Sequence, residues 1–406
     1  MAGLPRRLSC GARRNFRVSE RGRTVAMTGP MTQVRPSVHL ITASLFALLL
    51  NASCAQVPTD QEPPPPSAAH TSPSPFPPRM GHTSIATGNG VIIWGGHEED
   101  QSRPEASGAL YDPAQDSWTP IPQSPLAPRT RHSAVWTGKE MIIWGGSGEE
   151  KDGGRFLRDG AAYDPATQEW RKIRNAPFPI SSASALYHSR HIFMGPGSPT
   201  SRDDLGKLAV YSLLRDSWET IDIGLRVYGI APLGESSIAV VGESEGRTEV
   251  LEYRIGARGV REIISRGAAD QMSSITLVAD GSDVVLVLVP ESSSSEVHVI
   301  DPDGNLVKES DVSGDLHGQV DMVQYPLGRG EGWLHGESVV SISDRGLSRV
   351  DLRTMESRSW QPKEFRGRCG GFSASSLMND DIFVWGGRSC EGSALDAETA
   401  GLVVSL

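Results

Sequence analysis

The sequence predicts an all-β protein assembled from repeated four-stranded sheets. Composition is the first observation, because 44 glycines and 28 prolines with 38% hydrophobic residues and no collagen-like period suit many short strands joined by turns. The second is an internal repeat, in which a Gly-Gly pair, a Tyr and a Trp return in the same order about 50 residues later. The length of 406 residues allows one large or two ordinary domains, so the repeat decides the organisation.

Each copy of the repeat is interpreted as four short strands. The first copy contains Arg79-Met80-Gly81-His82, Val91-Ile92-Ile93-Trp94-Gly95-Gly96, Tyr111 and Trp118, and the second contains Arg129-Thr130-Arg131-His132, Met141-Ile142-Ile143-Trp144-Gly145-Gly146, Tyr163 and Trp170. Gly88-Asn89 and Gly138-Lys139 supply the first hairpin turn of each copy. The Tyr and the Trp are expected to fill the space between adjacent sheets while their polar tips find partners.

A Gly-Gly pair followed by Tyr, and by Trp about seven residues later, resembles the kelch motif. Kelch repeats fold as blades of a β-propeller, so the resemblance implies a β-propeller of kelch-type four-stranded blades. The sequence is similar in this respect to exported bacterial kelch proteins and to the central domain of galactose oxidase. The residues that carry the repeat are Gly95, Gly96, Tyr111, Trp118, Gly145, Gly146, Tyr163, Trp170, Tyr211, Trp218, Gly386 and Gly387.

Later copies of the repeat are weaker but keep a spacing of about 50 residues. The residue before the glycine position is assigned in successive copies to Trp94, Trp144, Met194, Val241, Leu288, Leu334 and Trp385. In the fourth copy Tyr253 keeps its position and Val260 takes that of the Trp, and in the sixth we assign Ser359-Trp360 to the Trp strand. Seven blades are therefore predicted; six or eight remain alternatives because copies four to six depend on spacing.

The last blade is one strand short. The chain ends at Gly401-Leu402-Val403-Val404-Ser405-Leu406, which matches the third strand of a copy. Propellers usually close with a strand from the other terminus, here the segment before Arg79, whose prolines make it a poor strand and predict partial closure. Cys369 and Cys390 lie symmetrically about the turn at Asn379-Asp380, so we expect a disulfide across the first hairpin of this blade.

The N-terminal region is expected to be an export signal followed by a linker. We divide the chain into a leader that is excluded from fold reasoning (1–30), a signal peptide (31–55), a Pro-rich linker (56–78) and the propeller (79–406). Leu40 to Leu50 is the one long apolar run. Ala52-Ser53-Cys54 resembles the end of a lipobox, which favours lipidation of Cys54, although Ser53-Cys54-Ala55 also satisfies an ordinary signal-peptidase site.

No set of residues in the sequence requires catalysis. His82 and His132 occupy equivalent positions, which favours a structural role. The odd offset between His188 and His191 would place them on opposite faces of one strand, and so argues against a shared metal, unless the chain turns there. We therefore predict no catalytic residues, no metal and no cofactor. A net charge of -10 without a long basic run argues against nucleic acid as a partner.

The predicted function is an exported, membrane-tethered kelch propeller that binds a protein or a glycan without catalysis. The alternative is a carbohydrate-active enzyme similar to the sialic-acid epimerases among kelch propellers. A copper oxidase like galactose oxidase is disfavoured, because the two folded cysteines are expected to pair and four of seven tyrosines occupy the repeat position. The charged segments 96–108 and 146–160 are interpreted as solvated loops that can also serve in binding.

Overall fold

The protein is described by a computed structural model. The chain divides into two compact units, Met1–Glu62 and Pro63–Leu406, and every described residue lies in the second. The structure describes residues 65–406 except 99–102, 150–155, 196–203, 205, 258, 267–271, 280–282, 291–293, 315, 317–330, 344–345, 366–371, 377–380 and 389–400.

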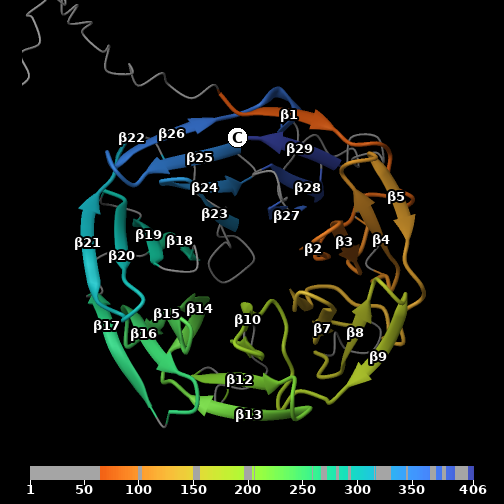
Figure 1. The fold of residues 1–406 in the computed structure, drawn as a ribbon, viewed down its shortest axis with the longest axis horizontal. Helices are drawn as coiled ribbons and strands as arrows, with labels where there is room; N and C mark the ends of the chain where they lie inside the picture. Colours follow the sequence, from red (N-terminus) through yellow and green to blue (C-terminus); the bar gives the residue numbers. More distant parts are fainter. Residues whose placement is uncertain are drawn as a thin grey trace, which may run out of the picture. The chain divides into compact units, whose positions relative to one another are not determined.

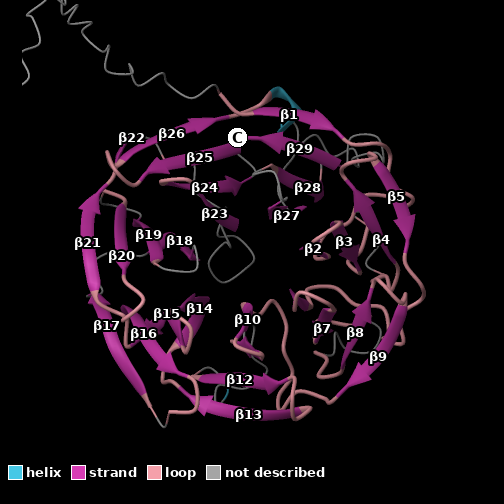
Figure 2. Ribbon diagram, in the orientation of Figure 1, coloured by secondary structure: helices cyan, strands magenta, loops and turns pink. Residues whose placement is uncertain are grey.

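The second unit is a ring of seven antiparallel blades arranged around a central axis (Figure 1). Each blade is a meander whose first strand lies innermost and whose fourth lies at the rim, and nearly all regular structure is strand (Figure 2). This confirms the predicted seven-bladed, all-β propeller. Blades 1 to 3 consist of β2 (Thr83–Thr87), β3 (Gly90–Trp94), β4 (Gly108–Asp112) and β5 (Ser117–Pro120); β6 (Ser133–Trp136), β7 (Met141–Trp144), β8 (Gly160–Asp164) and β9 (Glu169–Ile173); and β10 (Ala185–His188), β11 (His191–Met194), β12 (Lys207–Ser212) and β13 (Ser217–Asp222).

Blades 4 to 6 continue the same order, and blade 6 has an added rim strand. They consist of β14 (Arg226–Leu233), β15 (Ser237–Ser244), β16 (Arg247–Arg254) and β17 (Val260–Arg266); β18 (Met272–Ala279), β19 (Val284–Pro290), β20 (Glu296–Ile300) and β21 (Leu306–Asp311); and β23 (Glu331–His335), β24 (Ser338–Ser343), β25 (Gly346–Asp351) and β26 (Glu356–Trp360). The two-residue strand β22 (Ser313–Gly314) pairs in parallel with β26. A 3-10 turn (Lys363–Phe365) follows blade 6.

Blade 7 closes the ring with strands from both ends of the chain. It contains β27 (Phe372–Ser376), β28 (Ile382–Gly386), β29 (Gly401–Ser405) and, at the rim, β1 (Ser67–His70). The segment before Arg79 supplies the closing strand as predicted, but the expectation that its prolines make this closure partial was wrong. The propeller therefore begins within the stretch assigned to the linker. Ser67 pairs with Ser405 through to His70 with Leu402. This four-residue strand contains no proline although prolines flank it, which is why a Pro-rich segment supplies a complete strand.

The assignment of the sixth copy from spacing was wrong. Leu334 lies in the inner strand β23, whereas the strand equivalent to the glycine strand is β24. Trp360 pairs with Leu347, while the Tyr and Trp positions are taken by Val350 and Ser357. The spacing misled here because Gly336, two residues after Leu334, belongs to the first hairpin turn and not to a glycine corner.

Tryptophan pairs fill the junctions between blades 7, 1, 2 and 3. Trp385, Trp94 and Trp144 lie in the second strands of blades 7, 1 and 2 and are almost completely buried. Each packs on the tryptophan in the fourth, rim strand of the following blade. The ring centroids lie 6.2 Å apart for Trp385–Trp118 and Trp94–Trp170 and 5.6 Å apart for Trp144–Trp218. Each rim indole N–H donates to a carbonyl of the preceding blade at 2.9 Å, from Trp118 to Ser72, Trp170 to Pro122 and Trp218 to Arg174. Both parts of the expectation for the Trp, packing and a partner for its polar tip, are confirmed.

The Gly-Gly pair forms a corner that links one blade to the next. At Gly145 and Gly146 φ is +65° and +89°, a region that favours glycine. A β-carbon on Gly145 would lie 2.1 Å from the carbonyl oxygen of Ile180 in the next blade. The corner links are the N–H groups of Gly387, Gly96 and Gly146 to the carbonyl oxygens of Arg79 (2.9 Å), Arg129 (3.0 Å) and Ile180 (2.6 Å).

Candidate functional site: one face of the propeller

The two faces of the ring carry connections of different length. Because the second and fourth strands of a blade run in the same direction, the connections that follow them leave at one face, which we call the loop face. The connections after the first and third strands leave at the opposite turn face and are short, for example 88–89, 113–116, 137–140 and 165–168. Since binding residues concentrate on loops held by a rigid scaffold, the loop face is the candidate site.

The loop face is itself uneven. The connections after the second strand are long in blades 7, 1, 2 and 3, at 387–400, 95–107, 145–159 and 195–206. In blades 4, 5 and 6 they shrink to 245–246, 291–295 and 344–345. The long connections therefore belong to four consecutive blades of the ring, 7, 1, 2 and 3.

Backbone hydrogen bonds fix the base of the long connections. His97 and Met80 exchange N–H to carbonyl bonds of 3.0 and 2.8 Å, and Ser147 and Thr130 repeat this exchange one blade later at 2.8 and 3.0 Å. Farther along, Leu157 N–H donates to the carbonyl of Gly146 at 2.9 Å. The residues that follow each glycine corner are thus held in fixed positions at the loop face.

Polar side chains meet at equivalent positions above these bases. The Nδ1 atom of His97 lies 3.1 Å from Oγ1 of Thr130, which also donates to the carbonyl of Gly81 at 3.2 Å. One blade on, the hydroxyls of Ser147 and Ser181 lie 3.4 Å apart. Thr130 and Ser181 precede the inner strands β6 and β10, so both pairs lie on the loop face of blades 1 to 3, where Ser181 is buried.

Three left-handed residues connect these positions around the opening. Gly81, Arg131 and Ser182 have φ values of +62°, +57° and +52° and occupy equivalent places in blades 1 to 3. Arg131 N–H donates to Gly81 at 2.7 Å, and Ser182 N–H donates to Arg131 at 2.8 Å. A positive φ is costly for arginine and marks a position that the surrounding structure enforces. Arg131 is exposed, so this constraint presents a guanidinium beside the opening.

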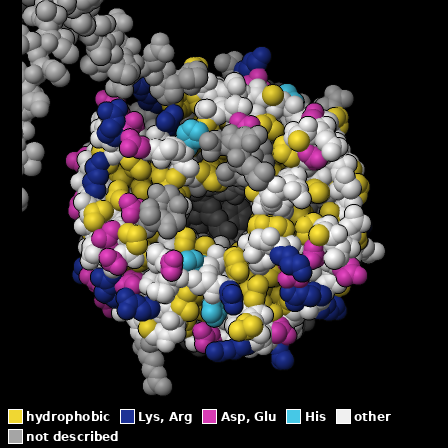
Figure 3. Space-filling model, in the orientation of Figure 1, with side chains coloured by type: hydrophobic (Ala, Val, Ile, Leu, Met, Phe, Trp, Pro, Cys, Tyr) yellow, Lys and Arg dark blue, Asp and Glu magenta, His cyan; other side chains and the backbone are white. Residues whose placement is uncertain are grey.

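The ring is hollowed at its centre when it is viewed along its axis (Figure 3). The inner strands line this channel, and several of their side chains are half-buried rather than buried, among them Tyr187, Tyr228 and Trp333. The Tyr228 hydroxyl donates to the Glu243 carboxylate, and Cζ of Arg226 lies over the Tyr228 ring, 5.8 Å from the ring centroid. Tyr187, Tyr228 and Trp333 also pack against the apolar clusters of the blades.

Buried arginines and histidines support the loop face from below. Arg129 is fully buried, donates to the carbonyls of Gly145 and Asp159 at 3.0 and 3.2 Å, and pairs with the Asp159 carboxylate at 2.9 Å. Burial lowers the pKa of His82 to about 3 and holds that of His132 well below its usual value. Both histidines are therefore neutral structural groups near pH 7, in agreement with the role expected from their repeated position.

For His188 and His191 the alternative left open by the sequence, a turn between them, is the one observed. The chain turns between them, and they lie directly opposite each other at the end of the β10–β11 hairpin. Within the described part of the chain no three His, Cys, Asp or Glu side chains are grouped so that they could hold a metal ion. Cys54, Cys369 and Cys390 lie outside the described residues, so lipidation and the disulfide remain predictions.

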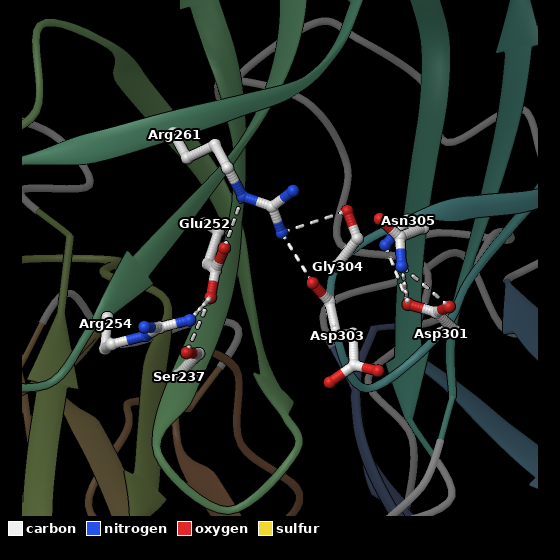
Figure 4. Close-up of polar contacts among 8 residues, drawn as sticks. All are labelled: Ser237, Glu252, Arg254, Arg261, Asp301, Asp303, Gly304 and Asn305. Carbon is white, nitrogen blue, oxygen red and sulfur yellow. Dashed lines mark hydrogen bonds and ion pairs between the residues drawn. The ribbon is translucent and has the colours of Figure 1, made fainter.

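An ionic cluster that the sequence did not indicate joins blades 4 and 5 (Figure 4). Glu252 is buried and accepts from Ser237 at 2.8 Å and from Arg261 at 2.6 Å. Arg261 also donates to the carbonyls of Asp303 (2.6 Å) and Gly304 (3.2 Å) on the neighbouring hairpin. These residues are far apart in sequence, so only the strand register brings them together. The cluster faces the turn side and serves to join blades.

Seven four-stranded blades with one loop-bearing face define the molecule as a β-propeller whose fold suggests a protein-interaction module. Residues 49–244 match the family model of the KLHDC2/KLHL20/DRC7 Kelch-repeats domain. The chain is a kelch-repeat β-propeller, as the Gly-Gly, Tyr and Trp spacing indicated. No curated protein matches it. Among the described residues, no helix has the length and apolar character needed to cross a membrane.

Proposed function

We propose that this propeller is an exported interaction module that binds a protein partner through its loop face over blades 7, 1, 2 and 3. The observation that carries the proposal is that the connections after the second strand are long in these four blades, and that backbone hydrogen bonds hold their first residues in blades 1 and 2. The loop face presents the exposed Arg131 and the half-buried hydroxyl residues Thr130 and Ser147, which suits hydrogen bonding to polar groups of a partner.

Export and tethering belong to the same proposal. The apolar run Leu40 to Leu50 followed by Cys54 supports a lipidated signal sequence, and the prolines between Pro63 and Pro66 suit a stiff tether. The tether would enter the ring at Ser67, the first residue of β1. Because β1 runs antiparallel to β29, Ser67 lies at the rim on the turn side, so a membrane anchor would leave the loop face accessible.

Site-specific photo-crosslinking in the native host tests the binding face. A photoreactive residue in place of Arg131 should give a discrete protein adduct, whereas the same residue in place of Gln115 or Thr167, both exposed on the turn face, should not. Adducts from the turn-face positions alone would refute the proposal. A glycan array probed with the same protein decides the ligand class, since binding to a glycan without any protein adduct would also count against it.

Fatty-acid labelling tests the tether. We expect labelled palmitate to be incorporated into the wild-type protein and to be lost in Cys54→Ala. Label that persists in the variant, or no label in the wild type, would refute lipidation at Cys54 while leaving the binding face untouched.

A further inference from the structure

Two equivalent histidines are clamped between blades on the loop-bearing side of the ring. His82 of blade 1 packs edge-on against Trp385 of blade 7, and His132 of blade 2 packs in the same way against Trp94 of blade 1. The ring centroids lie 4.9 Å apart in both pairs, and both histidines are buried. Each imidazole is thus part of a blade junction.

The fit around each imidazole leaves no room for added groups. A β-carbon on Gly386 would lie 2.6 Å from Cε1 of His82, and one on Gly95 would lie 2.6 Å from Cε1 of His132. These glycines belong to the corners that link blade 7 to blade 1 and blade 1 to blade 2. A charged imidazole could not acquire hydrating water there without separating the blades.

The charged and titratable groups around the clamps disfavour a positive charge. Burial is the largest cause of the lowered pKa of His82, and Arg79 and His97 lower it further. Hydrogen bonds with the backbone of Arg79 and Trp385 raise the pKa without reversing the shift. After burial, Arg129 and His82 lower the pKa of His132, whose Nε2 lies 2.8 Å from Oγ1 of Thr83. Glu105 and Glu98 favour the charged form of Arg79, and Asp159 pairs with Arg129. Protonation would therefore place an imidazolium beside a buried guanidinium at each junction.

We propose that the junctions between blades 7 and 1 and between blades 1 and 2 form an acid-sensitive latch, in which protonation of His82 and His132 separates the blades and releases the loop face. The hydrogen bonds from the glycine corners to the carbonyls of Arg79 and Arg129 lie beside the two histidines. The residues just before the histidines, Gly81 and Arg131, belong to the hydrogen-bonded series that continues to Ser182. Opening the clamps therefore disturbs the surface proposed to hold the partner. This last consequence rests on the proposed function, whereas the latch itself does not.

The sign of the pH dependence follows from proton uptake on opening. The closed junction holds its histidine neutral, while an opened junction lets it take up a proton below the ordinary pKa of 6.5. Closure is therefore favoured above pH 6.5 and weakens as the pH falls toward the lowered pKa of about 3 for His82. The opening constant should rise by up to about tenfold per pH unit for each histidine.

The junction between blades 2 and 3 provides an internal control. It has the same Gly145-Gly146 corner and the same buried tryptophan, Trp144, but Ala183 follows the left-handed Ser182 where histidine stands in blades 1 and 2. Its corner should therefore lack the acid response of the other two.

Hydrogen exchange of the full chain, followed by mass spectrometry between about pH 6.5 and 4.5 and corrected for intrinsic rates, tests the latch. Protection of peptides ending at Gly387 and Gly96 should fall by up to about tenfold per pH unit for each histidine, and return on neutralisation, while a peptide ending at Gly146 keeps its protection. An equal response at all three corners, or none at any, would overturn the proposal.

Two variants sharpen this test. His132→Ala, which copies the arrangement of blade 3, should flatten the response at Gly96, whereas His191→Ala, at the hairpin end of blade 3, should leave it unchanged. An undiminished response in folded His132→Ala, judged by near-ultraviolet circular dichroism at pH 7, would sink the latch. Crosslinking from position 131 separates the two proposals: a pH-dependent latch without any adduct supports the latch and refutes the binding face.

Discussion

The junctions on the two sides of the ring are built from different interactions. Between blades 1 and 2, Trp94 and Trp170 pack in the interface, and the indole N–H of Trp170 reaches back to blade 1. Between blades 4 and 5, Val260 stands at the Trp position and is 38% exposed, while Arg261 reaches forward to the next blade. Both junctions also bury an apolar cluster, which is aliphatic between blades 4 and 5, so the contrast lies in the contacts added to that cluster. The added aromatic contacts depend on burial and the added ionic ones on charge compensation, so only the latter should respond strongly to salt and acid.

The ionic pattern extends around the weaker copies of the repeat. Arg266 of blade 4 pairs with Glu296 of blade 5 at 3.2 Å, and Lys308 of blade 5 donates to the carbonyl of Leu352 in blade 6. Leu306, at the Trp position of blade 5, is 39% exposed. The short loop-face connections lie over these blades and the long ones over the aromatic blades. The tyrosine and tryptophan of the repeat thus occur together in blades 1 to 3, whose loop-face connections are long.

The largest expected effect comes from the glycine corner. Gly145→Ala should lower the free energy of unfolding by about 3 kcal/mol or more, because the new β-carbon meets the backbone of Ile180 at a positive φ. Gly138→Ala is the matched control, since its φ is +89° but nothing lies within 4 Å, and it should cost only about 1 kcal/mol. Equal losses in urea titrations would contradict the proposed role of the corner.

The next effect compares one residue from each kind of junction. Trp170→Ala should cost about 3 kcal/mol through lost packing, at low and high salt alike. Arg261→Ala should cost about 1 kcal/mol, because this side chain is half-exposed, and the loss should shrink in high salt. Denaturant titrations at two salt concentrations measure both, and a salt-dependent loss in Trp170→Ala would break the comparison.

Acid should weaken the ionic junction through Glu252. Burial raises the pKa of this carboxyl, but hydrogen bonds from Ser237 and Arg261 outweigh it, so the pKa is lowered in the folded protein. Its contribution to stability is present above the usual pKa of 4.5 and is lost as the pH falls through the lowered value. Glu252→Gln should therefore flatten the stability profile below pH 4.5; an unchanged slope would argue against the cluster.

The smallest effect concerns the tyrosine of the repeat. Tyr211 donates to Asp216 at 2.6 Å, so Tyr211→Phe should cost about 1 kcal/mol. In blade 2 the position of Asp216 is taken by Gln168, and burial and Asp164 alone raise the pKa of Tyr163, so Tyr163→Phe should be nearly neutral. Thermal unfolding of the two variants compares them directly, and a larger loss at Tyr163 would show that packing rather than this hydrogen bond sets the cost.

The sequence predicted the fold best where side chains have a repeated packing role. Tyr111, Trp118 and the glycine corners marked the strong blades because each position fills or permits a particular contact. Blade 6 was misaligned because Val350 and Ser357 take the marked positions and leave nothing to recognise. The positive φ of Arg131 and the pairing of Glu252 with Arg261 depend on register and on neighbouring blades, which a single sequence does not specify.

Hydrogen exchange of the wild-type protein at pH 7, in about 0.05 M and about 1 M sodium chloride, tests the contrast between the junctions most directly. Exchange in β17 and β21 should increase in high salt because the contacts of Arg261 and Arg266 are screened. Exchange in β9 and β13, which carry Trp170 and Trp218, should stay the same. An equal response of the four strands would contradict a ring in which aromatic contacts supplement the apolar junctions on one side and ionic contacts supplement them on the other.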